Sequence, residues 1–333
     1  MQAKSTPKKI VVLRFSSIGD IVLISPILRA LHSVNRYDIH FVTKRRFAQV
    51  NLHNKYVTKQ HLFDKDPREI LNKLKDESFD YVVDLQKNLR SKRLLGQLSC
   101  STATFPKLNI KKWLFVNFKI DWMPDVHIVD RYFEALKSLD HNRDMSGLDM
   151  FIGQENEINL VEFGLEEGRY TAVVLGAAHF TKRIPKSILE AVLDKMKGKV
   201  CLIGGPAEAN MGKELASKYP AKATNFCGTT NLQQSASLLK QSKQVLTADT
   251  GMMHIAAAFH KKIIVLWGNT VPQFGMYPYY GNQANRAHFF SVPDLSCRPC
   301  SKLGYKSCPK GHFDCMMKQD VDQIVKILNQ SIA

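Results

Sequence analysis

A polar turn at 248–251 carries groups that can bind an anion. Apolar runs at 245–246 and 263–267 flank the turn and a following segment of helix formers, a pattern that predicts strand, turn, helix and strand. At such a helix start, free N–H groups and the positive dipole end suit a phosphate. The turn reads Ala248, Asp249, Thr250, Gly251.

The individual residues of this turn support two interpretations. Gly251 lets the backbone come close to a ligand, and His254, four residues after Thr250, lies on the same helix face. Taken alone, the stretch fits an ordinary turn with Asp249 or Thr250 as N-cap equally well. Other strand ends shift the balance, because the predicted strands at 170–175 and 199–203 also run into glycines, Gly176 and Gly204-Gly205.

Asp20 stands at the start of a predicted helix near the N-terminus. The run 8–13 reads as a buried strand, a turn containing Gly19 follows, and an apolar helix is expected over 21–31. This order opens a Rossmann-like half, although the dinucleotide fingerprint GxGxxG is absent. The Asp20 carboxylate either stabilises the helix start, by about 0.3–1 kcal/mol, or acts as a general base at the sheet edge.

The rest of the chain alternates strands and helices, and its 333 residues are enough for two domains. A polar stretch at about 139–168 is the expected linker. Further strands are expected at 39–42, 79–85 and 225–228, and helices at 67–77, 127–139, 186–196, 232–239 and, amphipathic, 321–328.

The formal net charge of +17 suits an anionic partner. Basic clusters such as 44–46 and 90–93 lack the aromatic interleaving of a single-strand nucleic-acid platform, so nucleic-acid binding is a weak alternative. No apolar run reaches the roughly 18 residues of a membrane-spanning helix, and the run at 10–13 is too short for a signal peptide. Together with an odd number of cysteines, seven, this predicts a cytoplasmic protein.

Four cysteines near the C-terminus have a spacing that can bind a metal. The first pair forms a CxxC with zinc spacing, but the second pair forms no such knuckle. A thiol-rich loop without metal is the favoured interpretation, and metal binding is left open. The cysteines are Cys297, Cys300, Cys308 and Cys315, with His312 between the last two.

These motifs resemble the heptosyltransferase family of bacterial glycosyltransferases, which use sugar nucleotides in lipopolysaccharide assembly. The resemblance implies an α/β GT-B fold: two Rossmann-like domains facing across a cleft, with a C-terminal helix returning to the first. The resemblance implies an acceptor-binding domain over 1–165, a nucleotide-sugar-binding domain over 166–315 and the C-terminal helix over 316–333. The motifs are RFSSIGDIVLISPILRAL (14–31), LGAAHFTKRIP (175–185), LIGGPAE (202–208), TADTGMMHIAAA (247–258) and CRPC…SCPKGHFDCM (297–316).

The resemblance also implies roles for individual residues. Asp20 is expected to take the proton from the acceptor hydroxyl and Lys182 to contact the donor diphosphate. Where the family often has a phosphate-binding hydroxyl, this chain has Ala177-Ala178, so either Thr181 substitutes or that contact is missing. The implied donor-binding residues are Thr181, Gly205, Glu208, Asp249, Thr250, Gly251 and His254, and the acceptor-binding residues are Lys44, Arg45, Arg46 and Arg90.

The implied reaction is an inverting transfer of a heptose or related sugar from a nucleotide-activated donor, with ADP-heptose favoured, to a lipopolysaccharide core or related glycolipid. A lysine and helix N–H groups can offset diphosphate charge, so neither a cofactor nor a catalytic metal is expected. The expected partners are the donor, an anionic glycolipid and the inner leaflet of the inner membrane. A sugar-nucleotide epimerase or hydrolase on the same fold is the alternative enzyme, distinguished by its action on donor alone.

Overall fold

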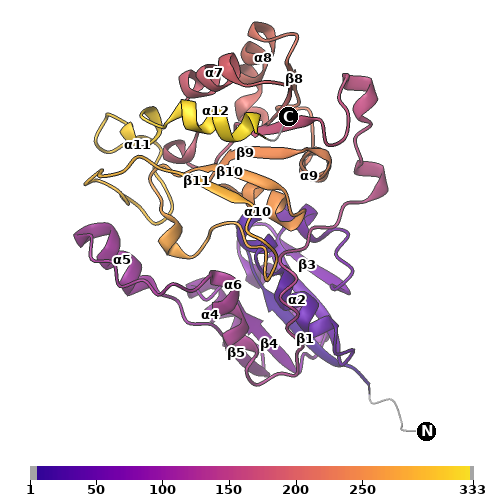
Figure 1. Ribbon diagram of the computed structural model, residues 1–333. Helices are drawn as coiled ribbons and strands as arrows, with labels where there is room; N and C mark the ends of the chain where they lie inside the picture. Colours follow the sequence, from indigo (N-terminus) through magenta and orange to yellow (C-terminus); the bar gives the residue numbers. More distant parts are fainter. Residues whose placement is uncertain (1–5, 331–333) are drawn as a thin grey trace. The chain divides into compact units, whose positions relative to one another are not determined.

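The computed structural model describes residues 6–330, which divide into two compact α/β units, each built on a parallel sheet (Figure 1). The first unit contains the chain up to Lys107 together with Val126–Phe151. The second contains Leu108–Asp125 and the chain from Ile152 onward. The chain therefore changes unit at residue 151 and not at the predicted 165, and 108–125 joins the second unit.

The sheet of the first unit has five strands in the order β3-β2-β1-β4-β5. Its central strand β1 is completely buried from Ile10 to Leu13, as its apolar run predicts. Strands β3 and β5 were not predicted from the sequence, since both carry polar residues. The strands are β1 (Lys8–Leu13), β2 (Tyr37–Lys44), β3 (Lys59–Phe63), β4 (Tyr81–Asp84) and β5 (Ser101–Thr104).

The helix predicted over 21–31 is two helices, α1 (Ile18–Val22) and α2 (Ser25–His32). Pro26 in the first turn of α2 explains the break, because proline has no N–H for a continuous helix. The predicted helix at 67–77 likewise begins as a 3-10 turn. The other helical segments of this unit are η1 (Arg45–Asn51), η2 (Pro67–Ile70), α3 (Leu71–Asp76), α4 (Leu89–Leu95), α6 (Ile128–Phe133) and η3 (Glu134–Leu136).

The sheet of the second unit has six strands in the order β11-β10-β9-β6-β7-β8. Numbered from β6, this is the 3-2-1-4-5-6 order of a dinucleotide-binding fold, and the first unit has the same order for its five strands. The strands are β6 (Tyr170–Val174), β7 (Lys199–Ile203), β8 (Ala223–Asn225), β9 (Gln244–Ala248), β10 (Lys262–Leu266) and β11 (Ala287–Phe290).

This strand order locates the ligand site in each unit. In an open parallel sheet, ligands bind beyond the carboxyl ends of the two strands where the order reverses. Those strands are β1 and β4 in the first unit, and β6 and β9 in the second. Asp20 follows β1, whereas Lys182 and Asp249 follow β6 and β9. The predicted site residues therefore lie where each sheet can hold a ligand.

The C-terminal helix α12 (Val321–Asn329) corrects a prediction. It was expected to return to the first domain, but it packs on α7 (Lys186–Lys195) within the second unit. Its apolar face, Ile324, Val325 and Leu328, belongs to the second unit's core. The amphipathic pattern predicted a buried face but could not specify which unit covers it.

The remaining helices of the second unit include α10, which begins at the predicted turn, and α5, which lies in a stretch for which no element was predicted. None of the helices between residues 6 and 330 combines the length and the apolar content needed to cross a bilayer. These helices are α5 (Asn109–Phe118), α8 (Ala209–Lys218), α9 (Leu232–Gln241), α10 (Gly251–Ala258) and α11 (Asp314–Met317), with short 3-10 turns η4 (Gln154–Asn156), η5 (Leu160–Phe163), η6 (Phe180–Lys182), η7 (Pro206–Glu208) and η8 (Pro272–Phe274).

Candidate functional site

The turn between β9 and α10 has the predicted structure of an anion site. Thr250 is the N-cap of α10, and its Oγ1 accepts a hydrogen bond of 3.4 Å from the Met253 N–H. Thr247 Oγ1 lies 3.2 Å from the same hydroxyl oxygen. Gly251 is the first helical residue. The first N–H groups of a helix have no carbonyl partner within the helix, and they give α10 a positive end at the edge of the sheet.

Lys182 and Asp249 form an ion pair at this edge. Lys182 Nζ lies 2.6 Å from Asp249 Oδ2, and the Thr270 hydroxyl donates to the same oxygen at 2.7 Å. Burial alone would raise the pKa of Asp249, but the Lys182 ammonium and the Thr270 hydroxyl outweigh burial and hold this pKa below its usual value. Asp249 is therefore a carboxylate at neutral pH that orients the Lys182 ammonium beside the α10 N-terminus.

The depressed pKa of Asp249 predicts a pH-dependent contribution to stability. A group whose folded pKa is lowered stabilises the fold above its unfolded pKa, about 4 for aspartate, and loses this effect as the pH falls through the folded value. We expect Asp249→Asn to lower the free energy of unfolding by about 1–3 kcal/mol at pH 7, and by much less at pH 3. Urea denaturation at both pH values measures this difference.

The matched control for that prediction is Asp322→Asn. Asp322 also pairs with a lysine, Lys195, at 2.6 Å, but its side chain is 81% exposed. Exposed pairs contribute little, so this variant is expected to stay within about 0.5 kcal/mol of the native protein at pH 7. An Asp249→Asn deficit that is the same at pH 7 and pH 3 would contradict the proposed ionic origin.

Glu208 organises the glycine-rich turn after β7. Its Oε2 accepts from the Gly205 N–H at 3.0 Å, and its Oε1 lies 3.4 Å from Arg183 Nη2. A Cβ at Gly176 would come within 2.9 Å of Glu208 Oε2, so the absence of a side chain there makes room for this carboxylate. Glu208 is only 6% exposed, and in this structure it supports the turn.

Two predicted donor-binding side chains are buried. Thr181 is 1% exposed, and its hydroxyl accepts from the Tyr305 N–H at 2.9 Å. It therefore holds the loop around Tyr305 in the position described here, and does not present its hydroxyl to solvent. His254 is 3% exposed and lies close enough to Asp249 to help lower the pKa of that carboxyl.

Asp20 lies at the corresponding edge of the first unit, in the first turn of α1. Its Oδ2 accepts from the Ser17 N–H at 2.9 Å and from the Ser17 hydroxyl at 2.8 Å, and its Oδ1 pairs with the Arg14 guanidinium. Arg14 is 8% exposed and also donates to the carbonyls of Ser16 and Leu85. Arg14 directly follows β1 and was not predicted as a site residue.

The loop after β4 is the second part of this site and was also missed. Gln86 Oε1 accepts from the Phe15 N–H at 2.9 Å, which ties this loop to the turn after β1. Asp84 is buried and accepts from the Lys87 N–H at 2.7 Å and the Ser91 hydroxyl at 2.8 Å. A polar loop at a strand end was visible in the sequence, but nothing in it identified a bond to the turn after β1.

The predicted acceptor-binding residues are only partly brought together. Lys44 ends β2, and neighbouring Arg90 and Arg46 contribute, after burial, to lowering its pKa. Arg45 points to a different partner, Asp64, at 3.2 Å. Lys44, Arg46 and Arg90 therefore form a cationic group near the carboxyl end of β2, and Arg45 is paired apart from it.

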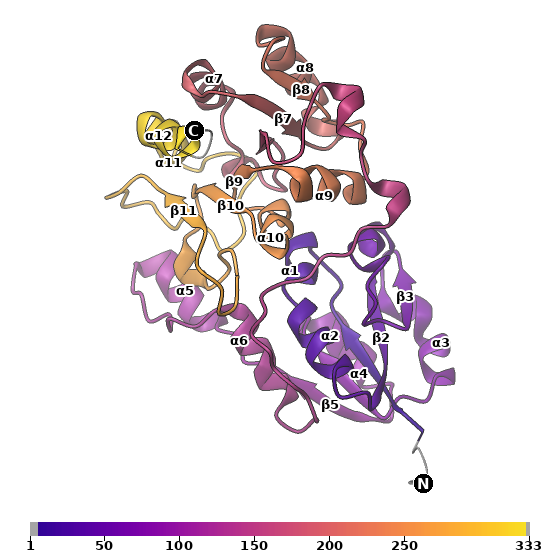
Figure 2. The same ribbon diagram turned by 45° about the vertical axis from the view of Figure 1, so that its right-hand side comes forward.

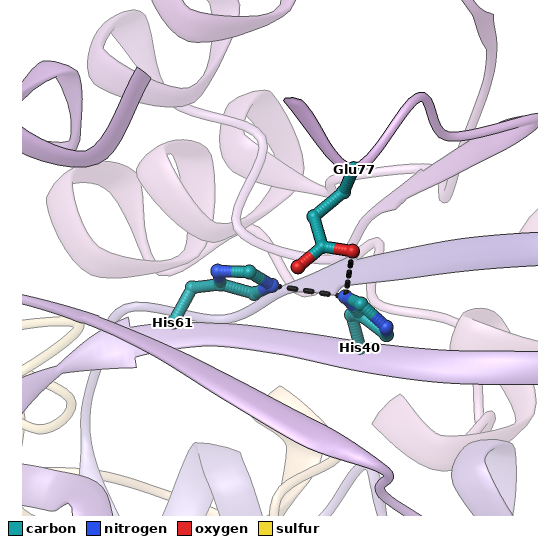
Figure 3. A group of neighbouring side chains, drawn as sticks. All are labelled: His40, His61 and Glu77. Carbon is teal, nitrogen blue, oxygen red and sulfur yellow. Dashed lines mark hydrogen bonds and ion pairs between the residues drawn. The ribbon is translucent and has the colours of Figure 1, made fainter. Parts of the chain in front are cut away.

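Within residues 6–330, one group of three side chains brings possible metal ligands within 4.8 Å of one another: His40, His61 and Glu77 (Figure 3). His40 Nδ1 lies 2.9 Å from His61 Nε2 and 4.0 Å from Glu77 Oε2. Lys59 and Lys9, at 2.5 and 3.0 Å, lower the pKa of Glu77 to about 2. Because two ammonium groups already balance this carboxylate, the group fits a structural network better than a cation site.

The four C-terminal cysteines surround one small cavity of about 20 Å³. Asn269 lines the same cavity, is 1% exposed, and neither polar atom of its side chain has a hydrogen-bond partner among the described residues. His312 Nε2 lies 4.0 Å from Cys297 Sγ. Thiols and an imidazole are ligand types that suit a transition metal. No three thiol or imidazole ligand atoms of this cluster lie within 4.8 Å of one another in the described residues. The side-chain positions therefore favour a thiol-rich loop over a closed metal site.

Comparisons with known proteins give a match to a family model and to curated relatives. A family model described as glycosyltransferase family 9 (heptosyltransferase) matches residues 68–307. Lipooligosaccharide heptosyltransferase 2 of Haemophilus influenzae is 37% identical over 79 residues, which cover 22% of this chain and 23% of that protein. The sequence match thus spans about a quarter of that curated relative.

Two solved structures have the same fold over nearly the whole chain. A glycosyl transferase family 9 protein from Veillonella parvula aligns with a TM-score of 0.78 and 21% identity, covering 99% of each chain. The E. coli ADP-heptose lps heptosyltransferase II aligns with a TM-score of 0.71 and 16% identity, covering 97% of this chain and 98% of that one. The predicted α/β fold of two Rossmann-like domains is therefore confirmed, while the predicted course of the C-terminal helix is not.

Proposed function

We propose a function from one premise: the chain belongs to glycosyltransferase family 9, the heptosyltransferase family, as its motifs predict. Our proposal is that it transfers a heptose, or a related sugar, from ADP-heptose to a lipopolysaccharide core or related glycolipid. The name of the E. coli neighbour includes both ADP-heptose and lps. The site of the second unit supports a sugar-diphosphate donor.

The observation that carries this proposal is the ion pair of Lys182 and Asp249 beside the N-terminus of α10. Lys182 Nζ can donate three hydrogen bonds, and one of them goes to Asp249. The others, with the free N–H groups of α10, suit the two phosphates of the donor. Asp249 is then a positioning residue, and Lys182 with the helix end stabilises the charge of the leaving diphosphate.

In the proposed reaction the acceptor hydroxyl oxygen attacks the anomeric carbon of the donor. A new carbon–oxygen bond forms as the bond to the diphosphate breaks, with inversion at that carbon. The hydroxyl proton passes to the Asp20 carboxylate, which acts as general base, and the nucleoside diphosphate leaves with the electron pair. Each step uses protein groups alone, so we propose metal-independent transfer.

The first unit supports an anionic acceptor. Lys44, Arg46 and Arg90 supply positive charge near the carboxyl end of β2, where phosphate or acid groups of a glycolipid core can bind. A glycolipid acceptor also places the protein at the cytoplasmic face of the inner membrane, and its net charge of +17 favours an anionic leaflet.

A thermal-shift panel of ADP-, GDP-, UDP- and CMP-sugars tests the donor. A ligand at about 100 times its Kd stabilises the folded state by about 2.7 kcal/mol, and we expect the ADP-sugar to give the largest shift. Free heptose is the matched control and is expected to give none. A larger shift with another sugar nucleotide would identify that nucleotide as the donor in place of ADP. The absence of a shift with all four would contradict the proposed donor site.

Product analysis separates transfer from the alternative enzyme activities. We expect ADP-heptose to remain intact over the assay without acceptor, and to yield ADP and glycosylated acceptor when a core oligosaccharide is added. Conversion of the donor alone would show an epimerase or hydrolase.

A further inference from the structure

Helix α5 and the segment that follows it expose large apolar side chains. No residue of α5 is buried. Ile110 is 75% exposed, Trp113 51%, Phe118 59% and Trp122 63%. Large exposed apolar patches on a soluble protein mark an interaction surface. We call these four residues the α5 apolar surface.

The opposite side of α5 is attached to the second unit. The Phe115 and Phe274 rings meet edge to face with centroids 5.9 Å apart, and Lys119 Nζ donates to the Pro299 carbonyl at 2.8 Å. Phe274 belongs to η8, and Figure 2 shows α5 next to an orange segment of the chain. Ile110 and Trp113 are three residues apart, and neither is three or four residues from Phe115 or Lys119. The helix is therefore held by one face while Ile110 and Trp113 lie on another, and Phe118 lies beside the attached face at the end of the helix.

Positive charge surrounds the α5 apolar surface. Residues 109–122 contain three lysines and one aspartate. The loop to which Lys119 is bound contains Arg298, Lys302, Lys306 and Lys310 between 297 and 313, and no acidic residue. The three lysines of this loop are exposed, as are Leu303 and Tyr305. The combination of aromatic, aliphatic and basic side chains is typical of helices that lie in a membrane interface.

We propose that α5 with the segment to Trp122 is the element that docks this protein on an anionic lipid bilayer. Trp113 and Trp122 would enter the headgroup region, where tryptophan is favoured, and the lysines would contact lipid phosphates. A second copy of the chain is a poorer partner for this surface, because the lysines of the two copies would then lie close together and repel one another. The proposal rests on the proposed glycolipid acceptor, which itself resides in a membrane.

The tryptophans provide a direct test on the unaltered protein. The chain has three, of which Trp113 and Trp122 are exposed and Trp267 is 1% exposed. On addition of phosphatidylglycerol/phosphatidylethanolamine vesicles we expect a blue shift of the emission, and quenching when the lipid tails are brominated near the headgroup. Pure phosphatidylcholine vesicles should give a much smaller change at low salt.

Variants locate the contact. Trp113→Ser combined with Phe118→Ser is expected to reduce the vesicle partition coefficient by about tenfold or more. Val161→Ser is the matched control, since Val161 is 82% exposed but lies in η5, and it should bind vesicles like the native protein. Circular dichroism and melting temperature establish that both proteins fold.

The results distinguish docking from the proposed function. Absence of a blue shift, or equal vesicle binding by the double variant and Val161→Ser, would overturn the docking proposal. So would a dimer that the double variant abolishes, because it would make a second copy the occupant. Transfer to a water-soluble core oligosaccharide is expected to be unchanged in the double variant, and absence of that activity in the native protein would refute the proposed function instead.

Discussion

Replacing Asp20 by asparagine is expected to lower the turnover number of sugar transfer by about 10²- to 10⁴-fold. The amide has nearly the shape of the carboxylate but cannot take the proton of the acceptor hydroxyl. Donor affinity should remain nearly unchanged, because the donor-binding groups proposed above lie in the second unit. Initial rates with a soluble acceptor and calorimetric titration with ADP measure the two quantities.

Two features of the structure shape the controls for this variant. Asp20 neutralises the buried Arg14 guanidinium, so Asp20→Asn should also lower the free energy of unfolding by about 1–3 kcal/mol, and assays must run well below its melting temperature. Ser17→Ala removes the 2.8 Å hydrogen bond to the same carboxylate but leaves the base. Ser17→Ala should lower the turnover number by less than about tenfold. Turnover of Asp20→Asn within a few-fold of native would show that Asp20 is not the base.

Replacing Lys182 by alanine is expected to weaken ADP binding by about 10- to 100-fold, the range for a hydrogen bond that involves a charged group. The variant also leaves Asp249 ionised without its cation, so the carboxylate would repel the diphosphate. Isothermal titration with ADP measures the affinity, and urea denaturation measures the accompanying loss of stability.

A neighbouring lysine and a double variant separate these two effects. Lys186, four residues after Lys182, is an exposed lysine that pairs with Glu214. Lys186→Ala should therefore leave ADP affinity unchanged. Lys182→Ala combined with Asp249→Asn removes both charges and should recover stability but not native affinity. Native affinity in that double variant would show that Lys182 acts only by neutralising Asp249, and unchanged affinity in Lys182→Ala would exclude Lys182 from the site.

The local elements of the site could be predicted from the sequence. The residues at 245–259 carry their own strand pattern, N-cap and glycine, and the structure has β9, Thr250 as cap and α10 there. Asp20 in the first turn of α1 was predicted for the same reason. Such features depend on neighbouring residues, so a single stretch of sequence contains the information that specifies them.

The elements that were not predicted from the sequence have weak local hydrophobic patterns. Strands β3 and β5 carry mostly polar residues, and α5 has apolar residues on more than one face, so none of the three shows a clear hydrophobic period. The amphipathic pattern of α12 was recognised, but its covering partner is α7 and the second unit's core. Periodicity predicts that a face is buried and does not specify what buries it.

The sequence by itself determined the family, the alternation of strands and helices, and the glycine-bearing strand ends. Only the tertiary structure decided which side chains meet. Lys182 and Asp249 are 67 residues apart, and Arg14 bonds to a carbonyl 71 residues away. Both contacts exist because β6 lies beside β9 and β1 beside β4. Strand order follows from the packing of the whole chain, and hydrophobic periodicity within one segment does not encode it.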